Sequence, residues 1–298
     1  MVGIVGPTAT GKSDLAVQVA QQVAGEVVNA DAAQLYRGMD IGTAKLTPTQ
    51  RRGIPHHQLD VLNVTDEASV AAYQIAARAD IDDILARGVV PILVGGSGLY
   101  VRAALDVLDI PPTDPLVRAA LEVEGDRLGT TAMYQRLAKV DAEAAAAIEP
   151  NNRRRIIRAL EVIELTGRSF SARMPHREYR RPSYVLGLLP PRTVTDVRID
   201  ARVHRMWADG LVTEVGGLLD RGLRSGKTAS RAVGYAQAVA EIDGTMTPGE
   251  AIEETQRLTR RLARRQESWF RADARIDWVD PDREDALARV LHRVAECE

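Results

Sequence analysis

The chain has 298 residues, 45% of them apolar and 27% charged, and a formal net charge of −2 at pH 7. These values predict a soluble globular protein with one large domain, or with a core domain and a smaller one. The near-neutral charge excludes a basic surface over the whole molecule, so any nucleic-acid contact must be local. The single cysteine, Cys297, excludes intrachain disulfides and cysteine metal sites. Because the sequence has no apolar run of about 18 residues and no leader pattern before its first strand, we expect a cytoplasmic protein.

A phosphate-binding loop is predicted at the start of the chain. Residues 6–13 read G-P-T-A-T-G-K-S, an apolar run precedes them, and apolar residues at helical spacing follow. This is the strand, loop and helix context that the motif G-x-x-x-x-G-K-S requires. In such a loop the backbone N–H groups and the helix N-terminus face phosphate oxygens, the Lys reaches the terminal phosphate, and the Ser hydroxyl is a ligand of Mg²⁺. The predicted phosphate-binding residues are Gly6, Pro7, Thr8, Ala9, Thr10, Gly11, Lys12 and Ser13, with Ser13 as the metal ligand.

Further short strands predict a parallel sheet with the site at its edge. Residues 25–31 form a strand that ends in Asp31, and 89–94 is the most apolar run of the chain. A second glycine loop, Gly95-Gly96-Ser97-Gly98, follows that run. Because ligands of open parallel sheets bind at the carboxyl ends of strands, Asp31 and Ser97 are expected beside the phosphate loop. The other predicted core elements are strands at 58–64, 184–189 and 276–279 and helices at 67–87, 200–221, 247–271 and 284–296.

The alternation of strands and helices stops near residue 112. From there to about residue 181 only helical patterns follow, at 116–128, 132–138, 141–148 and 155–166. The sequence therefore predicts an α/β fold: a P-loop NTPase-like parallel sheet core, 1–112 and 183–298, with helices on both faces, and a small all-helical insertion domain, 113–182.

Positive charge is concentrated in two segments. Between residues 151 and 181 there are nine Arg and three Glu, which gives a net charge of +6. The predicted helix 247–271 adds Arg257, Arg260, Arg261, Arg264 and Arg265. Two basic clusters beside a phosphate site indicate a polyanion held across both domains, although solvated helix faces of an Arg-rich protein are the alternative.

A simple ATPase is a weaker interpretation of the phosphate loop. Phosphate-loop hydrolases and kinases usually place a second Mg²⁺-organising Asp at the end of an apolar strand. Strand 89–94 ends in glycine instead, and only Asp31 fits that position. His56 and His57 do not predict a metal site, because adjacent His side chains point in different directions and no third ligand is near. Structural or substrate-loop roles are expected for them.

Seven motifs, in order, resemble one known family. They are G-P-T-A-T-G-K-S, D-A-A-Q-L-Y-R-G-M-D-I-G-T-A-K, P-H-H, P-I-L-V-G-G-S-G-L-Y, R-A-L-E-V, A-V-G-Y and R-R-Q-E-S-W-F-R. Over nearly the whole chain the sequence resembles the bacterial tRNA dimethylallyltransferases, also called tRNA isopentenyltransferases, of the IPP transferase family. Ala32, Leu46 and Ser97 replace the Ser, Pro and Thr that are common there, but Ser97 keeps the hydroxyl.

The resemblance implies transfer of a dimethylallyl group from dimethylallyl diphosphate to N6 of adenine 37, in tRNAs that read codons starting with U. Three residues would be catalytic. By this resemblance Asp31 orients N6 and takes its proton, Ser97 contacts the diphosphate and the incoming base, and Arg202 holds the diphosphate. The adenine would reach them only if it is flipped out of the anticodon loop.

The resemblance also implies the RNA contacts. They are Asp31, Ala32, Ala33, Gln34, Leu35 and Ser97 at the entrance, with Gln34 reading the base, Arg118, Arg154, Arg155 and Arg158 from the helical insertion, and Arg257 and Arg261 from helix 247–271. Two alternatives stay open. An adenylate isopentenyltransferase would use free AMP or ADP and would not need the Arg-rich insertion, and an ATP-dependent RNA-binding protein would leave the 89–98 loop unexplained. We expect tRNA and dimethylallyl diphosphate as partners, Mg²⁺ as cofactor, no membrane, and a monomer.

Overall fold

The computed structural model describes residues 1–170 and 177–296, and the chain forms two compact units. One unit comprises Met1–Asp106 and Tyr179–Glu298, and the other comprises Val107–Glu178. The division of the chain into separate folding domains with the boundaries given above stays a prediction. Arg173 of the predicted basic cluster and Cys297 lie outside the described residues. No helix within the described ranges is both long and apolar enough to cross a membrane.

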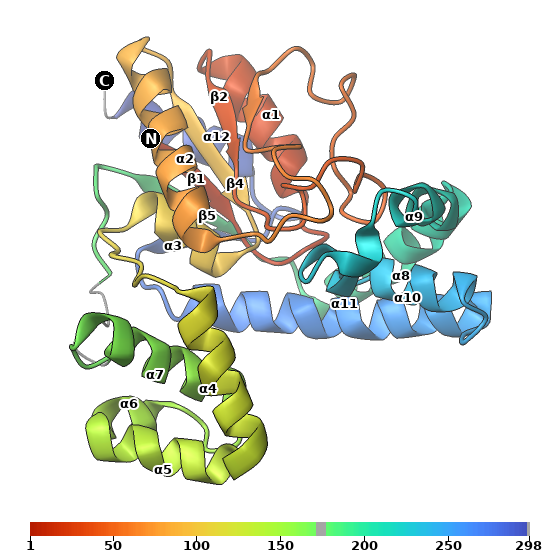
Figure 1. Cartoon of the computed structure of the whole chain (residues 1–298). Coiled ribbons are helices and arrows are strands. Elements are labelled where there is room, and N and C mark those ends of the chain that lie inside the picture. Colours follow the sequence, from red (N-terminus) through yellow and green to blue (C-terminus); the bar gives the residue numbers. More distant parts are fainter. Residues whose placement is uncertain (171–176, 297–298) are drawn as a thin grey trace. The chain divides into compact units, whose positions relative to one another are not determined.

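The larger unit is built on a six-stranded parallel sheet with the order β3-β2-β4-β1-β5-β6 (Figure 1). Its central strand β1 pairs with β4 on one side and β5 on the other, with Val2 opposite Ile92 and Tyr184. β1, β2 and β4 are buried along their whole length, which suits strands that are covered on both faces. The predicted α/β class is confirmed. The strands are β1 Val2–Val5, β2 Glu26–Asn29, β3 His56–His57, β4 Pro91–Gly95, β5 Tyr184–Leu188 and β6 Ile276–Val279.

Helices cover both faces of this sheet. α1 (Lys12–Gln22) and α12 (Ala286–Ala295) pack on one face, where their apolar side chains join the core of the sheet. α2 (Val70–Ala86) and α3 (Gly98–Leu105) lie together on the other face (Figure 1). The remaining elements of this unit are α8 Arg192–Ala208, α9 Leu211–Leu219, α10 Tyr235–Ile242, α11 Pro248–Arg271 and the short 3₁₀ turns η2 Leu223–Ser225 and η3 Ala229–Arg231.

Two predicted elements are wrong, and both errors arise at left-handed residues. The predicted strand 58–64 is not a strand, because Gln58 and Asp60 have φ values of +57° and +56°, which extended chain excludes. The predicted helix 200–221 is two helices, since Gly210 between α8 and α9 has a φ of +97°. The helices α3 and α10 were not predicted.

The smaller unit has its own apolar core. Its helices are α4 Pro115–Leu128, α5 Thr130–Val140, α6 Ala142–Ala147 and α7 Arg153–Thr166. Met133 and Leu137 of α5 pack with Ile156 and Leu160 of α7 in this core.

One carboxylate is buried among these helices. The side chain of Glu161 is 0% exposed and accepts hydrogen bonds from Thr113, Arg118 and Arg158. Burial alone would raise the pKa of Glu161, but these donors hold it at about 2. Glu161 therefore ties the loop before α4 and the first turn of α4 to α7.

Replacement of Glu161 by Gln is expected to destabilise the smaller unit by about 3 kcal/mol, because it leaves two arginines without their shared anion. Amide hydrogen exchange of α4 and α7 in the full chain measures this. In the wild-type protein the stabilisation is expected to be complete above the ordinary Glu pKa and to be lost as the pH falls toward 2. Glu164→Gln, at a half-exposed carboxylate on the same helix, is the control. Equal exchange in the two variants would contradict the prediction.

Candidate active site

The phosphate loop joins β1 to α1, as its motif predicts. Gly6 has a φ of +134°, and a Cβ added there would lie 2.4 Å from the carbonyl oxygen of Leu188. Gly11 has a φ of +84° directly before the first turn of α1. Ala9 packs against Ile199 of α8 and other apolar residues of α8 and α11. Both glycines are therefore required by the backbone, and the loop is braced from outside.

Lys12 is the first helical residue after this loop. Its side chain turns back, and Nζ donates to the carbonyl oxygen of Pro7. Burial lowers the pKa of Lys12 to about 7, while the charge of Asp31 opposes this shift and that of Arg202 adds to it. An ammonium that lacks a full counter-charge in such a place would be stabilised by an anionic ligand.

Arg202 brings a second cation to the loop from α8. Its Nη1 lies 3.4 Å from Oγ1 of Thr8, and burial lowers its pKa. The structure thus brings Lys12, Arg202 and the phosphate loop together, as the proposed diphosphate site needs.

The second glycine loop packs tightly at the same edge of the sheet. A Cβ added to Gly95 would lie 2.3 Å from the carbonyl oxygen of Ala30, at the end of β2. The Ser97 hydroxyl accepts a hydrogen bond from the N–H of Ala32 at 3.1 Å. Its own proton remains available to a ligand. Ser97 therefore lies directly beside the segment that begins with Asp31.

Gln266 of α11 links the two glycine loops. Its Nε2 donates to the carbonyl oxygen of Gly96 at 3.0 Å, and its Oε1 accepts from the N–H of Thr8 at 2.9 Å. A Cβ at Gly96 would lie 2.4 Å from that Nε2, and one at Gly98 would lie 2.0 Å from Trp269. Sequence reasoning missed this residue, although the motif R-R-Q-E-S-W-F-R contains it.

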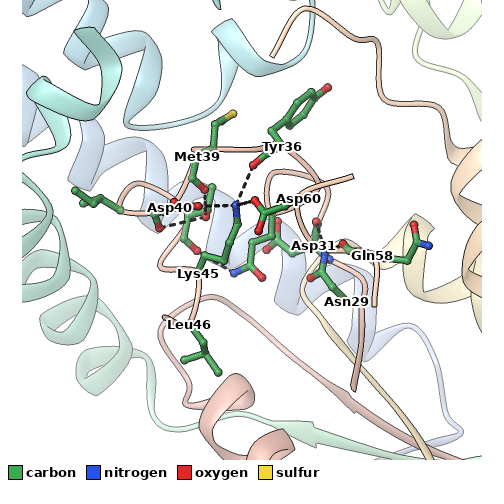
Figure 2. A network of polar contacts seen from close by, with 12 residues as sticks. Asn29, Asp31, Tyr36, Met39, Asp40, Lys45, Leu46, Gln58 and Asp60 are labelled. Carbon is green, nitrogen blue, oxygen red and sulfur yellow. Dashed lines mark hydrogen bonds and ion pairs between the residues drawn. The ribbon is translucent and has the colours of Figure 1, made fainter. Parts of the chain in front are cut away.

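Asp31 follows β2 and is held from both sides. Asn29 accepts from its N–H and donates to its carbonyl oxygen, both at 3.0 Å, and Figure 2 shows the two residues together. The Asp31 carboxylate accepts from the N–H of Ala33 at 3.0 Å. Burial raises the pKa of Asp31, against the opposing effects of that N–H and of Lys12. A carboxylate of this kind is a stronger base than an exposed one.

The other predicted RNA-contacting residues differ in their exposure and in their hydrogen-bond and ion-pair partners. The Gln34 amide donates to Thr43 at 3.1 Å, and Leu35 is buried. Arg118 and Arg158 are engaged by Glu161, and Arg257 pairs with Glu254 at 2.6 Å. Of these predicted contacts, Arg154, Arg155 and Arg261 are exposed and form no ion pair within the described residues. All of these RNA contacts stay predictions.

The histidine pair has ordinary structural partners. His57 Nε2 lies 2.8 Å from Glu26, which also binds Arg87, and His56 Nδ1 lies 2.8 Å from the carbonyl oxygen of Ile54. The hydrogen bond from Arg87 is the main reason that the pKa of Glu26 falls to about 2. Among residues 1–170 and 177–296, no three His, Cys, Asp or Glu side chains could hold a metal ion together.

The fold and site define an α/β protein of the P-loop class, with a carboxylate and two cations at the carboxyl edge of a parallel sheet. The family model described as IPP transferase matches residues 34–273. The chain therefore belongs to the IPP transferase family.

Relatives and solved structures agree with this family. The tRNA dimethylallyltransferase of Kineococcus radiotolerans is 60% identical over 294 residues, 96% of this chain and 93% of that protein. The corresponding protein of Thermobifida fusca is 57% identical and covers 99% of this chain and 94% of its own. The crystal structure of the full-length tRNA isopentenylpyrophosphate transferase of Bacillus halodurans is similar with a TM-score of 0.71, at 40% identity over 99% of this chain and 95% of that one. A eukaryotic dimethylallyltransferase acting on tRNA gives a TM-score of 0.83, at 25% identity over 98% and 77%.

Proposed function

We propose that the protein transfers the dimethylallyl group of dimethylallyl diphosphate to N6 of adenine 37, in tRNAs that read codons starting with U. The observation that carries this proposal is the position of Asp31. Its carboxylate, with a raised pKa, lies within electrostatic range of Lys12 in the phosphate loop, and the N–H of the next residue, Ala32, donates to Ser97. A base next to a diphosphate cradle suits alkyl transfer to a weak nucleophile better than nucleotide hydrolysis. Relatives that cover nearly the whole chain are named for transfer to tRNA.

The proposed reaction uses the groups at this edge as follows. The allylic C–O bond breaks and the diphosphate leaves, while the loop N–H groups, Lys12 and Arg202 stabilise its growing negative charge. The exocyclic N6 of adenine forms the new C–N bond, and its proton passes to the carboxylate of Asp31. The hydroxyl of Ser97 donates a hydrogen bond to a diphosphate oxygen. Gln266 keeps the two glycine loops at a fixed separation while this happens.

The residues present fit Mg²⁺ as a cofactor. Mg²⁺ prefers oxygen ligands and is commonly held by one or two protein groups together with substrate phosphates and water. Ser13, in the first turn of α1 next to Lys12, offers one such hydroxyl oxygen. When bound, the ion would supply positive charge to the leaving group.

The same proposal covers the partner and the location. The tRNA anticodon arm would present the flipped base to the segment Asp31–Leu35, with the exposed arginines of α7 and α11 on its backbone. We propose that the enzyme acts in the cytoplasm as a monomer.

A transfer assay with radiolabelled dimethylallyl diphosphate tests this function. It offers unmodified tRNA with adenine 37, the same tRNA with guanine 37, and free AMP. Label on the adenine 37 tRNA alone is the expected result. Label on AMP would instead favour an adenylate isopentenyltransferase. ATP hydrolysis without transfer to any acceptor would overturn the proposal.

Replacement of both Arg154 and Arg155 by Ala is expected to weaken tRNA binding without lowering the stability of the smaller unit. Both residues are exposed on α7 and form no ion pair in the part of the chain that the structure describes. Each lost phosphate contact should reduce the slope of log K against log salt by about one. Filter binding between low and physiological salt measures that slope. Arg283→Ala, at a residue whose side chain is 79% exposed, is the control. An unchanged slope in the double variant would remove these two residues from the RNA interface.

A further inference from the structure

Lys45 is a buried lysine at the centre of a polar network whose two carboxylates, Asp40 and Asp60, are 57% and 38% exposed. Its Nζ donates to Asp40 at 2.7 Å, to Asp60 at 2.6 Å and to the carbonyl oxygen of Tyr36 at 2.9 Å, as Figure 2 shows. The side chain is only 2% exposed. An ammonium has three donors, so this group is fully used inside the protein and has none left for a substrate. Any effect of Lys45 on a substrate must therefore act through the residues that its ammonium holds in place.

The network holds a segment whose backbone is unusual. Residues 31–45 contain neither a helix nor a regular strand, and Ala44 and Asp60 have φ values of +50° and +56°. Non-glycine residues keep such left-handed conformations where surrounding contacts determine them. Lys45 supplies several of these contacts, since its own N–H also donates to the carbonyl oxygen of Asp40 at 3.0 Å. Glu214 of α9 fixes the same turn by accepting from the N–H of Ile41 at 2.8 Å.

Hydrogen bonds lead from these partners of Lys45 to the acceptor side of the site. The N–H of Asp60 donates to the carbonyl oxygen of Gln34 at 3.3 Å. The Gln34 side chain donates to Thr43, inside the turn that Lys45 closes. The N–H of Gln34 in turn donates to the carbonyl oxygen of Asp31 at 3.2 Å. A displacement of the network would therefore move Gln34 and Asp31.

We propose that Lys45 is a positioning residue for the acceptor base. It fixes the segment 31–45 so that Asp31 and Gln34 are correctly placed to contact the adenine. This inference rests on the proposed transfer to tRNA. The contacts of the Lys45 ammonium all lie within residues 36–60, whereas the phosphate loop is braced by α8, α11 and Gln266. The Lys45 ammonium thus makes no direct contact with the phosphate loop, so we expect its loss to affect the acceptor side much more than binding of the diphosphate donor.

Steady-state kinetics of Lys45→Met with each substrate varied tests the proposal. The kcat/KM for tRNA is expected to fall about 10²-fold, since small misplacements of catalytic groups have effects of that size. The KM for dimethylallyl diphosphate is expected to stay within about twofold, because uniform donor binding is untouched. Lys227→Met is the matched control, at a lysine that is 76% exposed and 3.4 Å from its partner Glu67. A KM for dimethylallyl diphosphate that rises as much as kcat/KM for tRNA falls, or unchanged tRNA kinetics, would overturn the proposal.

Asp60→Asn provides the second arm and carries the test if Lys45→Met does not fold. It keeps the shape of the side chain but weakens one of the three hydrogen bonds, so a loss of about tenfold in kcat/KM for tRNA is expected, with the KM for dimethylallyl diphosphate unchanged. The double variant should lose no more than Lys45→Met, because the two residues act through one contact. Additive losses would count against the network. A wild-type protein that transfers to no acceptor would instead overturn the proposed function, which separates the two failures.

Discussion

Replacement of Asp31 by Asn is expected to lower the single-turnover rate of transfer by a factor of about 10² to 10⁴, the usual contribution of a positioned acid or base. The affinity for tRNA should remain nearly unchanged. Asn keeps the shape of the side chain and an oxygen that can accept from the N–H of Ala33, so the turn at this position is preserved. Asp83→Asn, at a carboxylate that is 68% exposed, controls for the loss of a charge. Equal losses in rate and in tRNA affinity would contradict the assignment of Asp31 as the base.

The pH dependence of transfer gives an independent check on Asp31. Burial raises the pKa of this carboxyl, and only its ionised form can accept a proton from N6. The rate is therefore expected to fall as the pH decreases through a value above the ordinary pKa of Asp, and Asp31→Asn should lack this decrease. Because the folded state holds the proton more tightly than the unfolded chain, ionisation of Asp31 lowers stability as the pH rises. The Asn variant should therefore be at least as stable as the wild type at neutral pH, which separates lost chemistry from lost folding.

The sequence predicted those parts of the site that depend on local patterns. The phosphate loop, Asp31 at the end of β2 and Ser97 after β4 follow from short apolar runs and from the rule that parallel strands end at one edge of a sheet. Arg202 was assigned from family resemblance, and the structure places it on α8 next to Thr8.

The parts that were missed depend on contacts between distant residues. Gln266 reaches the phosphate loop across more than 250 positions of sequence, and no periodicity indicates such a partner. Lys45 stands in a recognisable motif, but its burial depends on contacts with Tyr36, Asp40 and Asp60 that the motif does not indicate. The left-handed residues Gln58 and Asp60 likewise explain why 58–64 is not a strand, because a pattern of apolar residues carries no information about φ. Tertiary contacts decided each of these cases.

Replacement of Lys12 by Met is expected to reduce the rate of transfer by a factor of about 10² to 10³, the size seen when one group that stabilises a developing negative charge is removed. Among the described residues, the Lys12 ammonium donates only to the backbone carbonyl of Pro7, and burial lowers its pKa to about 7. An incoming diphosphate supplies the missing counter-charge, and this stabilisation grows as the C–O bond breaks. The loss should therefore appear more strongly in kcat than in the affinity for dimethylallyl diphosphate.

The stability of the Lys12→Met variant distinguishes this role from a structural one. A lysine whose pKa is lowered by folding opposes the folded state while it is charged. This effect is complete below about pH 7, decreases as the pH rises, and disappears above the ordinary lysine pKa of 10.5. Removal of the charge should thus raise the midpoint of thermal unfolding at pH 6, while transfer is nearly abolished. Lys139→Met, at an exposed lysine in the last turn of α5, is the control and should change neither quantity. A Lys12→Met protein that unfolds at a lower temperature and loses activity in proportion would show that Lys12 supports the loop rather than the leaving group.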